Sequence, residues 1–265
     1  MKNPREMDSF ESFYDEAYKA NDLSGFDDTA ALDRLVCLKR FLRKKTIKLR
    51  PKRILDYGCG QGRYFPIWRE LFPDAKLYGA EISREAIKIA LIKQVNLIQN
   101  IWHIQKNITP VNNAYFDLII SVETMEHVEN LLAYLKDIYR LLAPGGIFIW
   151  TTPCGNPYSL EWIWGFVTHG IQATEDGFHR FRWESIDHVR RLQSKELSFI
   201  MKELGFKKIC FDFRTHFFGT IVYQIWIRIP KQKYFIKLLA TFAHLDYLLF
   251  RKLPNGASMI GIARK

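Results

Sequence analysis

A run of alternating glycines is the part of this sequence that most clearly suggests chemistry. Asp56 precedes Gly58, Gly60 and Gly62, and the run follows an apolar segment that begins at Arg53. Glycine lets the backbone turn sharply and approach a ligand closely, and a helix that starts behind such a turn offers unpaired N–H groups. The pattern therefore predicts a small-molecule site between a strand and a helix.

The spacing of these glycines argues against a dinucleotide. A turn that binds a pyrophosphate follows the pattern G-x-G-x-x-G, and counting from Gly58 places Arg63 where the last glycine is required. The carboxylate of Asp56 would also repel a pyrophosphate. It suits a ligand with a positive ammonium or sulfonium group. S-adenosylmethionine carries both groups, so we expect that cofactor at this turn.

Further cofactor contacts are expected at the ends of the following strands. Glu81 ends a predicted strand, where a carboxylate can accept hydrogen bonds from both ribose hydroxyls. Asn107 follows the third predicted strand and is expected to bond the adenine edge, although an ordinary turn asparagine would look the same. The complete predicted cofactor set is Asp56, Gly58, Cys59, Gly60, Glu81, Ile82, Asn107 and Val122, the last at the end of the fourth strand.

A second group of reactive side chains follows the fourth predicted strand. Glu123, Glu126 and His127 form an E-x-x-E-H pattern where an acceptor would lie beside the cofactor. Three interpretations stay open. The three side chains hold a divalent metal that lowers the pKa of an acceptor hydroxyl, His127 acts alone as a general base, or the group packs against the cofactor without a chemical role. His127 is the predicted catalytic residue.

Alternating strands and helices are predicted to carry both groups. The strands are expected at residues 53–58, 76–81, 100–105, 117–122 and 147–151, and the helices at 63–72, 83–93 and 130–142. Such alternation is typical of a parallel sheet with helices on both faces, where ligands bind at the carboxyl ends of the strands. Residues 1–30 are expected to be an exposed lead-in and 31–48 an amphipathic helix. We therefore divide the chain into a helical lead-in, 1–50, and one α/β domain, 51–265.

These motifs resemble those of class I S-adenosylmethionine-dependent methyltransferases. Residues 54–62 (ILDYGCGQG) are similar to the first motif of that family, 78–82 (YGAEI) to its second, 116–121 (FDLIIS) to its fourth strand, and 141–153 (LLAPGGIFIWTTP) to its fifth. The resemblance implies a Rossmann-like α/β fold with a seven-stranded, mostly parallel sheet whose last strand is antiparallel. The E-x-x-E-H pattern resembles O-methyltransferases of ubiquinone biosynthesis, in which these positions are associated with a divalent metal.

Two helical insertions depart from the minimal fold of that family and are expected to form the acceptor side. The first, residues 154–190, includes a tryptophan-rich helix and several arginines; Arg190 and its neighbour Arg191 are expected either to hold an anionic acceptor group or to form a solvated basic face. The second, residues 214–256, is apolar but interrupted by charges, so it should not span a bilayer. The predicted acceptor is a hydroxyl of a small-molecule, lipid-like or sugar compound, with peripheral membrane contact as a further hypothesis.

Charge and composition leave two rival functions. The 265 residues carry a formal net charge of +11 with a basic stretch from Arg34 to Arg53, which would suit RNA or DNA. Against nucleic acid, the sequence after the fourth strand is Val-Glu-Thr-Met and lacks the Asn-Pro-Pro-Tyr-type element of base-flipping enzymes. The other rival is a non-catalytic partner subunit that binds the cofactor. Four widely separated cysteines suggest neither a zinc site nor a redox dithiol, and without a signal peptide or membrane span we expect a cytoplasmic protein.

Overall fold

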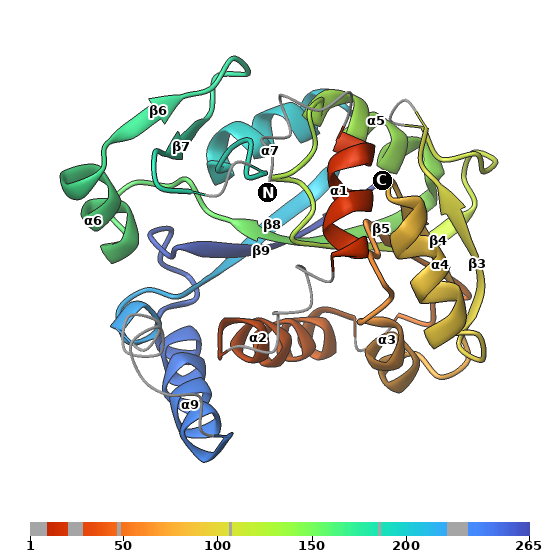
Figure 1. Ribbon diagram of the computed structural model, residues 1–265, viewed down its shortest axis with the longest axis horizontal. Helices are drawn as coiled ribbons and strands as arrows, with labels where there is room; N and C mark the ends of the chain where they lie inside the picture. The colour runs from red at the N-terminus through yellow and green to blue at the C-terminus, as the bar shows by residue number, and fades with distance from the viewer. Residues whose placement is uncertain (1–9, 21–28, 47–48, 106–107, 185–186, 222–232) are drawn as a thin grey trace.

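A seven-stranded sheet forms the centre of the computed structural model, which describes residues 10–20, 29–46, 49–105, 108–184, 187–221 and 233–265. The strand order is β3-β2-β1-β4-β5-β9-β8 (Figure 1). The strands are β1 (Arg53–Tyr57), β2 (Lys76–Glu81), β3 (Ile98–His103), β4 (Phe116–Val122), β5 (Leu142–Pro153), β8 (Lys207–Arg214) and β9 (Ser258–Arg264). β9 runs antiparallel to β5 and β8, and the other neighbouring pairs are parallel. The predicted Rossmann-like α/β sheet is confirmed.

Helices cover both faces of this sheet, as predicted. One face carries α2 (Thr29–Thr46), α3 (Phe65–Leu71), α4 (Arg84–Lys93) and α9 (Lys233–Phe250), and the other carries α5 (Leu131–Leu141) and α7 (Ser194–Glu203). Side chains cap two of the helices that follow strands. Ser83 Oγ accepts a hydrogen bond from Ala86 N at 3.1 Å, and Asn130 Oδ1 accepts one from Ala133 N at 2.9 Å. Such caps satisfy N–H groups that have no partner within the helix.

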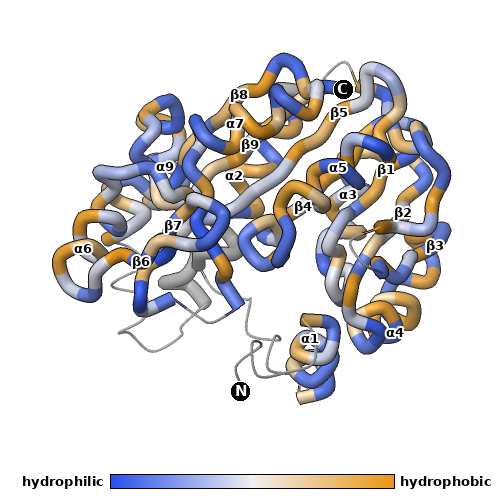
Figure 2. Tube along the Cα trace, turned by 90° about the horizontal axis from the view of Figure 1, so that it is seen from above, coloured by the Kyte–Doolittle hydropathy of each residue, from blue (hydrophilic) through white to orange (hydrophobic). Residues whose placement is uncertain are grey.

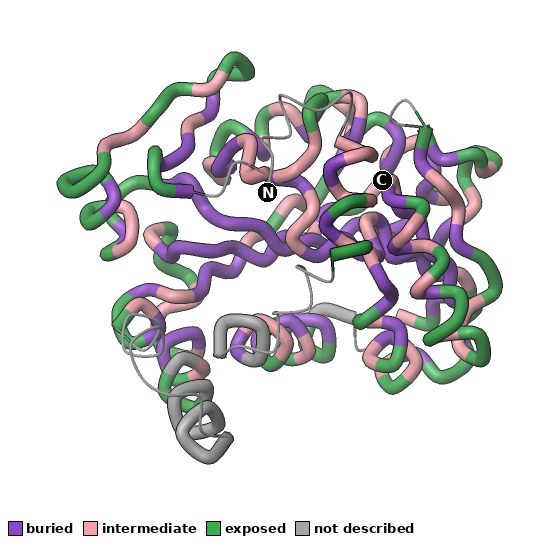
Figure 3. The backbone as a smooth tube through the Cα atoms, in the orientation of Figure 1, coloured by how far each residue is buried: buried purple, intermediate pink, exposed green. Residues whose placement is uncertain are grey.

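The central strands are buried on both faces because their side chains are apolar on both. In β4, Leu118 and Ile120 join the core cluster that includes α2 and α3, whereas Phe116 and Ile119 join the cluster that includes α5 and α7. Figure 3 shows burial continuing along the neighbouring strands. Apolar burial is the main favourable term in folding. This packing holds the carboxyl ends of β2, β1 and β4, which are adjacent in the sheet, at one edge.

The N-terminal segment contains a helix that packs onto the domain, so the expectation of an exposed lead-in is wrong for this part. α1 (Phe10–Lys19) lies beside α4 (Figures 1 and 2), with Phe13 and Ala17 buried. Its Asp15 accepts a hydrogen bond from Ser83 Oγ at 2.6 Å. The apolar residues of this segment recur at helical spacing. The expectation of an exposed segment overlooks this signal.

The insertions contain one predicted helix and one hairpin that has no counterpart among the predicted elements. α6 (Leu160–Thr168) is the tryptophan-rich helix, and β6 (Ile171–Ala173) pairs with β7 (His179–Phe181) in a separate two-stranded sheet. α9 lies in the segment expected to form part of the second insertion. Among the described residues, no helix combines the length and hydropathy needed to cross a membrane. The domain boundary at residue 50 stays a prediction, although α2 shares a core cluster with α3.

Candidate active site

The glycine turn lies at the end of β1 and is tied to the neighbouring strand. Gly58 N and Cys59 N both donate to Ala80 O, at 2.7 and 3.1 Å. The three alternating glycines have φ angles between 52° and 79°, a left-handed conformation that residues with side chains rarely adopt. A Cβ atom on Gly58 would lie 2.4 Å from Thr124 Cγ2. The turn therefore requires glycine both for its backbone conformation and for space.

Glu81 connects the end of β2 to this turn. Its Oε2 accepts a hydrogen bond from Gly60 N at 2.8 Å, and its Oε1 accepts bonds from Ile82 N and Ser83 N, both at 2.9 Å. Burial raises the pKa of Glu81 above its ordinary value, and these three N–H groups oppose that effect. The carboxylate is thus fixed at the edge of the sheet where the ribose is expected. Its contact with a ribose, like that of Ile82 with the cofactor, stays a prediction.

Asp56 lies beneath the turn. It is 1% exposed, and its Oδ2 accepts a hydrogen bond from Trp68 Nε1 at 2.8 Å. Burial raises the pKa of Asp56 to about 7, although the bond from Trp68 lowers it. This bond holds α3 against the turn. Direct contact of Asp56 with a cofactor stays a prediction, as do the contacts of the buried Cys59 and Val122, and Asn107 lies outside the described residues.

Two tyrosines of α1 reach the same edge of the sheet, and sequence reasoning missed both. Tyr18 Oη lies 2.6 Å from the place where a Cβ atom on Gly60 would stand, so α1 covers the turn. The ring centroids of Tyr14 and His127 are 6.1 Å apart. The buried hydroxyl of Tyr14 has no hydrogen-bond partner among the described residues. Burial raises the pKa of both tyrosines. The helical recurrence of apolar residues in α1 is the signal that could have identified them.

Glu123 pairs with a cationic side chain of α2. Its Oε2 lies 3.1 Å from an Nη atom of Arg34, and its Oε1 accepts a hydrogen bond from Thr151 Oγ1 at 2.8 Å. Burial alone would raise the pKa of Glu123, but Arg34 and Arg214 hold it below its ordinary value. Both oxygens of Glu123 are therefore engaged within the protein, and its expected role at a metal stays a prediction.

His127 is held in one tautomer by a residue far away in the sequence. Its Nδ1 lies 3.0 Å from Asp187 O. Because a carbonyl oxygen only accepts hydrogen bonds, Nδ1 carries the proton and Nε2 carries the lone pair. Burial and the neighbouring His188 lower the pKa of His127 to about 4, against the effect of Asp187. The imidazole is therefore neutral at physiological pH with a lone pair on Nε2, although a pKa this low makes it a weaker base than an ordinary histidine.

Glu126 and His188 complete a cluster around His127. Glu126 Oε2 accepts a hydrogen bond from Thr152 Oγ1 at 2.9 Å, whereas its buried Oε1 lies 3.9 Å from His127 Nε2 and has no hydrogen-bond partner among the described residues. Burial and the neighbouring Glu123 raise the pKa of Glu126 to about 8. Ligand atoms of Glu126, His127 and His188 all lie within 4.8 Å of one another. A carboxylate oxygen without a hydrogen bond beside two imidazoles fits the metal that the resemblance implies, and His188 is a further candidate ligand that the sequence did not suggest.

Two arginines that were expected to face solvent or an anionic acceptor are buried structural residues. Arg190 and Arg191 are 2% and 5% exposed. Arg190 pairs with Asp176 and donates to backbone carbonyls of the segment after β4. Arg191 pairs with Glu161 at 2.9 Å and with Glu184 at 2.6 Å. Both predictions for these two arginines are wrong, because carboxylates and carbonyls of the protein satisfy both guanidinium groups. These contacts hold the insertion onto the domain.

Comparison with known proteins extends these observations. Residues 30–210, more than half of the chain, match a family model described as a methyltransferase domain. The chain is 31% identical over 141 residues to malonyl-[acyl-carrier protein] O-methyltransferase of Hahella chejuensis, covering 52% of this chain and 48% of that protein. It is 30% identical over 127 residues to ubiquinone biosynthesis O-methyltransferase of Cereibacter sphaeroides, covering 44% of this chain and 51% of that protein. The chain spans about half the length of the curated relatives it matches.

A solved structure shares the fold across nearly the whole chain. A S-adenosylmethionine-dependent methyltransferase from Archaeoglobus fulgidus is similar with a TM-score of 0.53 and 18% identity, covering 87% of this chain and 94% of that one. At this identity the likeness concerns the fold alone. The family match, the sheet order and the glycine turn agree with the resemblance seen in the sequence. The chain belongs to the methyltransferase domain family and has the class I S-adenosylmethionine-dependent methyltransferase fold.

Proposed function

We propose that this protein transfers a methyl group from S-adenosylmethionine to a hydroxyl oxygen of a small-molecule or lipid-linked acceptor. The observation that carries the proposal is a neutral His127 at the same edge of the sheet as the glycine turn, with its Nδ1 held by Asp187 O. The sulfonium methyl is already activated. The protein has to align the acceptor, exclude water and take the proton of the hydroxyl.

The cofactor side supports the proposal through charge and fit. Glu81 and Asp56 are acids beside a turn whose glycines have left-handed φ angles, and an ionised carboxylate there favours the sulfonium and ammonium groups. In this arrangement Glu81 accepts from the ribose hydroxyls and the turn approaches the methionine part. Tyr18 of α1 then closes over Gly60 and excludes water from the turn.

The chemistry of the acceptor follows from the proton that must be removed. The relatives act, by their names, in ubiquinone biosynthesis and on malonyl-[acyl-carrier protein]. A malonyl group offers a carboxylate, which is already ionised at neutral pH and needs no base, whereas a hydroxyl does. A buried, neutral His127 with a lone pair on Nε2 therefore favours a hydroxyl acceptor. In this proposal the hydroxyl of Tyr14, which has no hydrogen-bond partner among the described residues, donates a hydrogen bond to the same acceptor.

A divalent metal would be held by Glu126, His127 and His188, where it would lower the pKa of a bound hydroxyl. Treatment with a chelator separates the two roles of His127. Full turnover after chelation supports His127 as the proton acceptor by itself. Loss of turnover that added Mg²⁺ restores supports a shared role with the metal.

The exposed side chains of α6 support a lipid-linked acceptor. Trp164, Phe166 and Val167 are 60%, 55% and 74% exposed, and Figure 2 shows α6 as a largely hydrophobic segment at the rim of the molecule. Exposed aromatic side chains on a chain of net charge +11 suit contact with an anionic membrane surface. Co-sedimentation with anionic liposomes tests this point. Wild-type protein should sediment and Trp164→Ser should sediment less, whereas wild-type protein that stays in the supernatant would remove membrane contact from the proposal.

Ion pairs within the protein weaken the case for nucleic acid. In the basic stretch, Arg34 pairs with Glu123, and both Lys39 and Arg43 pair with Glu70. These cations are partly neutralised where a phosphate backbone would have to bind them. A salt-dependent mobility shift with RNA or DNA would restore the nucleic-acid alternative.

Transfer of a labelled methyl group to two acceptors of different chemistry tests the proposed function. One acceptor is a catechol with a prenyl tail, and the other is a malonyl thioester. We expect labelled product from the catechol and a large loss of that product in His127→Gln. Product from the thioester alone would contradict the hydroxyl assignment. Binding of S-adenosylhomocysteine without turnover on either acceptor would favour a non-catalytic subunit.

A further inference from the structure

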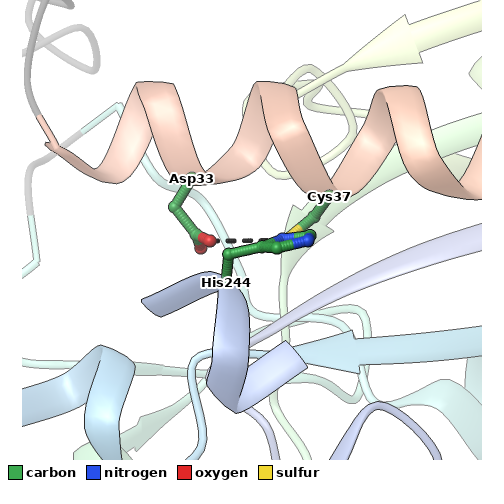
Figure 4. A group of neighbouring side chains, drawn as sticks. All are labelled: Asp33, Cys37 and His244. Carbon is green, nitrogen blue, oxygen red and sulfur yellow. Dashed lines mark hydrogen bonds between the residues drawn. The ribbon is translucent and has the colours of Figure 1, made fainter. Parts of the chain in front are cut away.

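A second group of metal-ligating side chains lies where α2 meets α9, and it shares no residue with the candidate active site. Asp33 and Cys37 lie one turn apart on the same face of α2, and His244 approaches them from α9 (Figure 4). Cys37 Sγ lies 3.3 Å from Asp33 Oδ1 and 3.8 Å from His244 Nδ1. The ligand atoms of all three residues lie within 4.8 Å of one another.

The two separations from Cys37 Sγ match those between ligands of one tetrahedral ion. Zinc lies about 2.3 Å from a thiolate sulfur and about 2.1 Å from imidazole nitrogen or carboxylate oxygen, so sulfur and either lighter atom should be about 3.6 Å apart. Both distances from Cys37 Sγ are within 0.3 Å of that value. Three protein ligands would leave a fourth position for water. Asp33 and Cys37 are buried whereas His244 is only half-buried, so an ion can enter from the side of α9.

The charges around the three residues also suit a divalent cation. Asp33 Oδ2 lies 3.1 Å from an Nη atom of the buried Arg214, which leaves Oδ1 directed toward Cys37. The buried Asp246 adds a second negative charge that acts on Cys37. With a protonated thiol, the two carboxylates and the buried guanidinium of Arg214 leave the buried part of the region with one net negative charge, and the exposed Arg40 adds a positive charge near His244 that solvent screens. A divalent cation that displaces the thiol proton brings this local charge to zero.

We propose that Asp33, Cys37 and His244 form a binding site for a borderline-soft divalent cation, with zinc as the expected ion. A mixed set of thiolate, imidazole and carboxylate favours zinc over magnesium or calcium, which prefer oxygen ligands alone. On binding, the Cys37 S–H bond breaks, its proton goes to solvent, and sulfur donates to the metal. No oxidant or reductant is involved.

The ion would join two helices that are far apart in the chain. Cys37 and His244 are separated by 207 residues, which explains why cysteine spacing in the sequence gives no sign of the site. Arg34 follows Asp33 directly on α2 and pairs with Glu123 at the candidate active site. A metal that fixes α2 against α9 would therefore also fix the position of this ion pair.

Cobalt is the probe that distinguishes this site from every other group of ligands described above. A thiolate bound to Co²⁺ gives a charge-transfer absorption in the near ultraviolet, and the cluster of Glu126, His127 and His188 has no thiolate. The experiment titrates the reduced, full-length, metal-free protein with Co²⁺ and then adds Zn²⁺. We expect the band to saturate near one equivalent in the wild type, with release of one proton, and to disappear when Zn²⁺ displaces cobalt.

Two variants and one control make the assignment specific. Cys37→Ser should lose the band, and Cys154→Ser, which removes another buried thiol, should keep it. His244→Gln should raise the Kd for Co²⁺ more than about 100-fold, beyond the usual cost of losing an outer-shell partner. His244 is half-buried, so this variant remains informative if Cys37→Ser does not fold. A wild type without the band, a band that persists in Cys37→Ser, or an unchanged Kd in His244→Gln would overturn the site.

Discussion

The two sides of the candidate active site differ in how far apart their residues lie in the chain. The cofactor side comes from one turn, Gly58–Gly62, and from Glu81. Backbone N–H groups of the turn and of the two residues after Glu81 donate hydrogen bonds to its carboxylate and hold it in place. The acceptor side is assembled from four separate segments: α1, α2, the loop after β4 and residues 187–188. A contiguous motif can be recognised locally, whereas a set of long-range contacts needs the fold. Changes on the two sides should therefore separate cofactor binding from turnover.

The largest effect is expected from removing the imidazole on the acceptor side. His127→Gln should lower turnover on a hydroxyl acceptor by about 10²- to 10⁴-fold, the usual contribution of a general base. It should leave the affinity for S-adenosylhomocysteine nearly unchanged, because His127 belongs to the acceptor side. Steady-state turnover and calorimetric titration measure the two quantities. His169→Gln, at an exposed histidine, is the control. A loss of cofactor affinity in His127→Gln as large as its loss of turnover would contradict the separation of the two sides.

A large loss of stability is expected from removing the cation that pairs with Glu123. Arg34→Met leaves a mostly buried carboxylate without its partner, which should lower the free energy of unfolding by about 3–5 kcal/mol. Arg43→Met is the control, because Arg43 pairs with Glu70 on the surface and should cost less than about 1 kcal/mol. Urea unfolding measures both. Equal losses in the free energy of unfolding of the two variants would show that the pair with Glu123 does not hold α2 in position.

A smaller loss is expected at the glycine turn. Gly58→Ala should lower the free energy of unfolding by more than about 2 kcal/mol, because it combines left-handed backbone strain with a clash against Thr124. Gly145→Ala has a similar φ, 76°, and no atom within 4 Å of the added Cβ, so it should show the backbone strain alone, about 1–2 kcal/mol. Urea unfolding of the two variants isolates the clash, and equal losses would mean that Thr124 moves aside.

The smallest effect concerns the contact that joins α1 to the cofactor side. Gly60→Ala places a methyl group 2.6 Å from Tyr18 Oη, and Tyr18→Phe removes that oxygen. The double variant should therefore be more stable than Gly60→Ala by about 1 kcal/mol, the lower end of the cost of overpacking. A double-mutant cycle by urea unfolding measures this coupling. Strict additivity of the two changes would mean that α1 does not cover the turn in solution.

The sequence predicts the sheet well because the relevant signals are local. The apolar strand of residues 117–122, the helices expected at 83–93 and 130–142 and the glycine turn all appear in the structure where the pattern places them. α1 is the main exception. Residues 1–30 are expected to be exposed, but Phe13 and Ala17 are buried on the helix that packs against α4, and helical periodicity would have shown this face.

The acceptor side could not be predicted to the same depth, because its partners are distant in sequence. The pattern of Glu123, Glu126 and His127 is local, yet Glu123 pairs with Arg34 and His127 bonds Asp187. A linear motif cannot show which of its side chains an outside residue will engage. The same holds for the buried Arg190. Its charge suggested an anionic ligand, but a carboxylate and backbone carbonyls of the protein satisfy it.

Calorimetric titration with S-adenosylhomocysteine, on the wild type and on Glu81→Ala, tests the central claim most directly. We expect micromolar binding to the wild type and no measurable heat with Glu81→Ala, while both proteins keep the same far-ultraviolet circular dichroism. Glu85→Ala, at the start of the neighbouring helix, should bind like the wild type. Equal affinity in the wild type and Glu81→Ala would contradict the assigned site, and a folded wild type that does not bind would contradict the proposed cofactor.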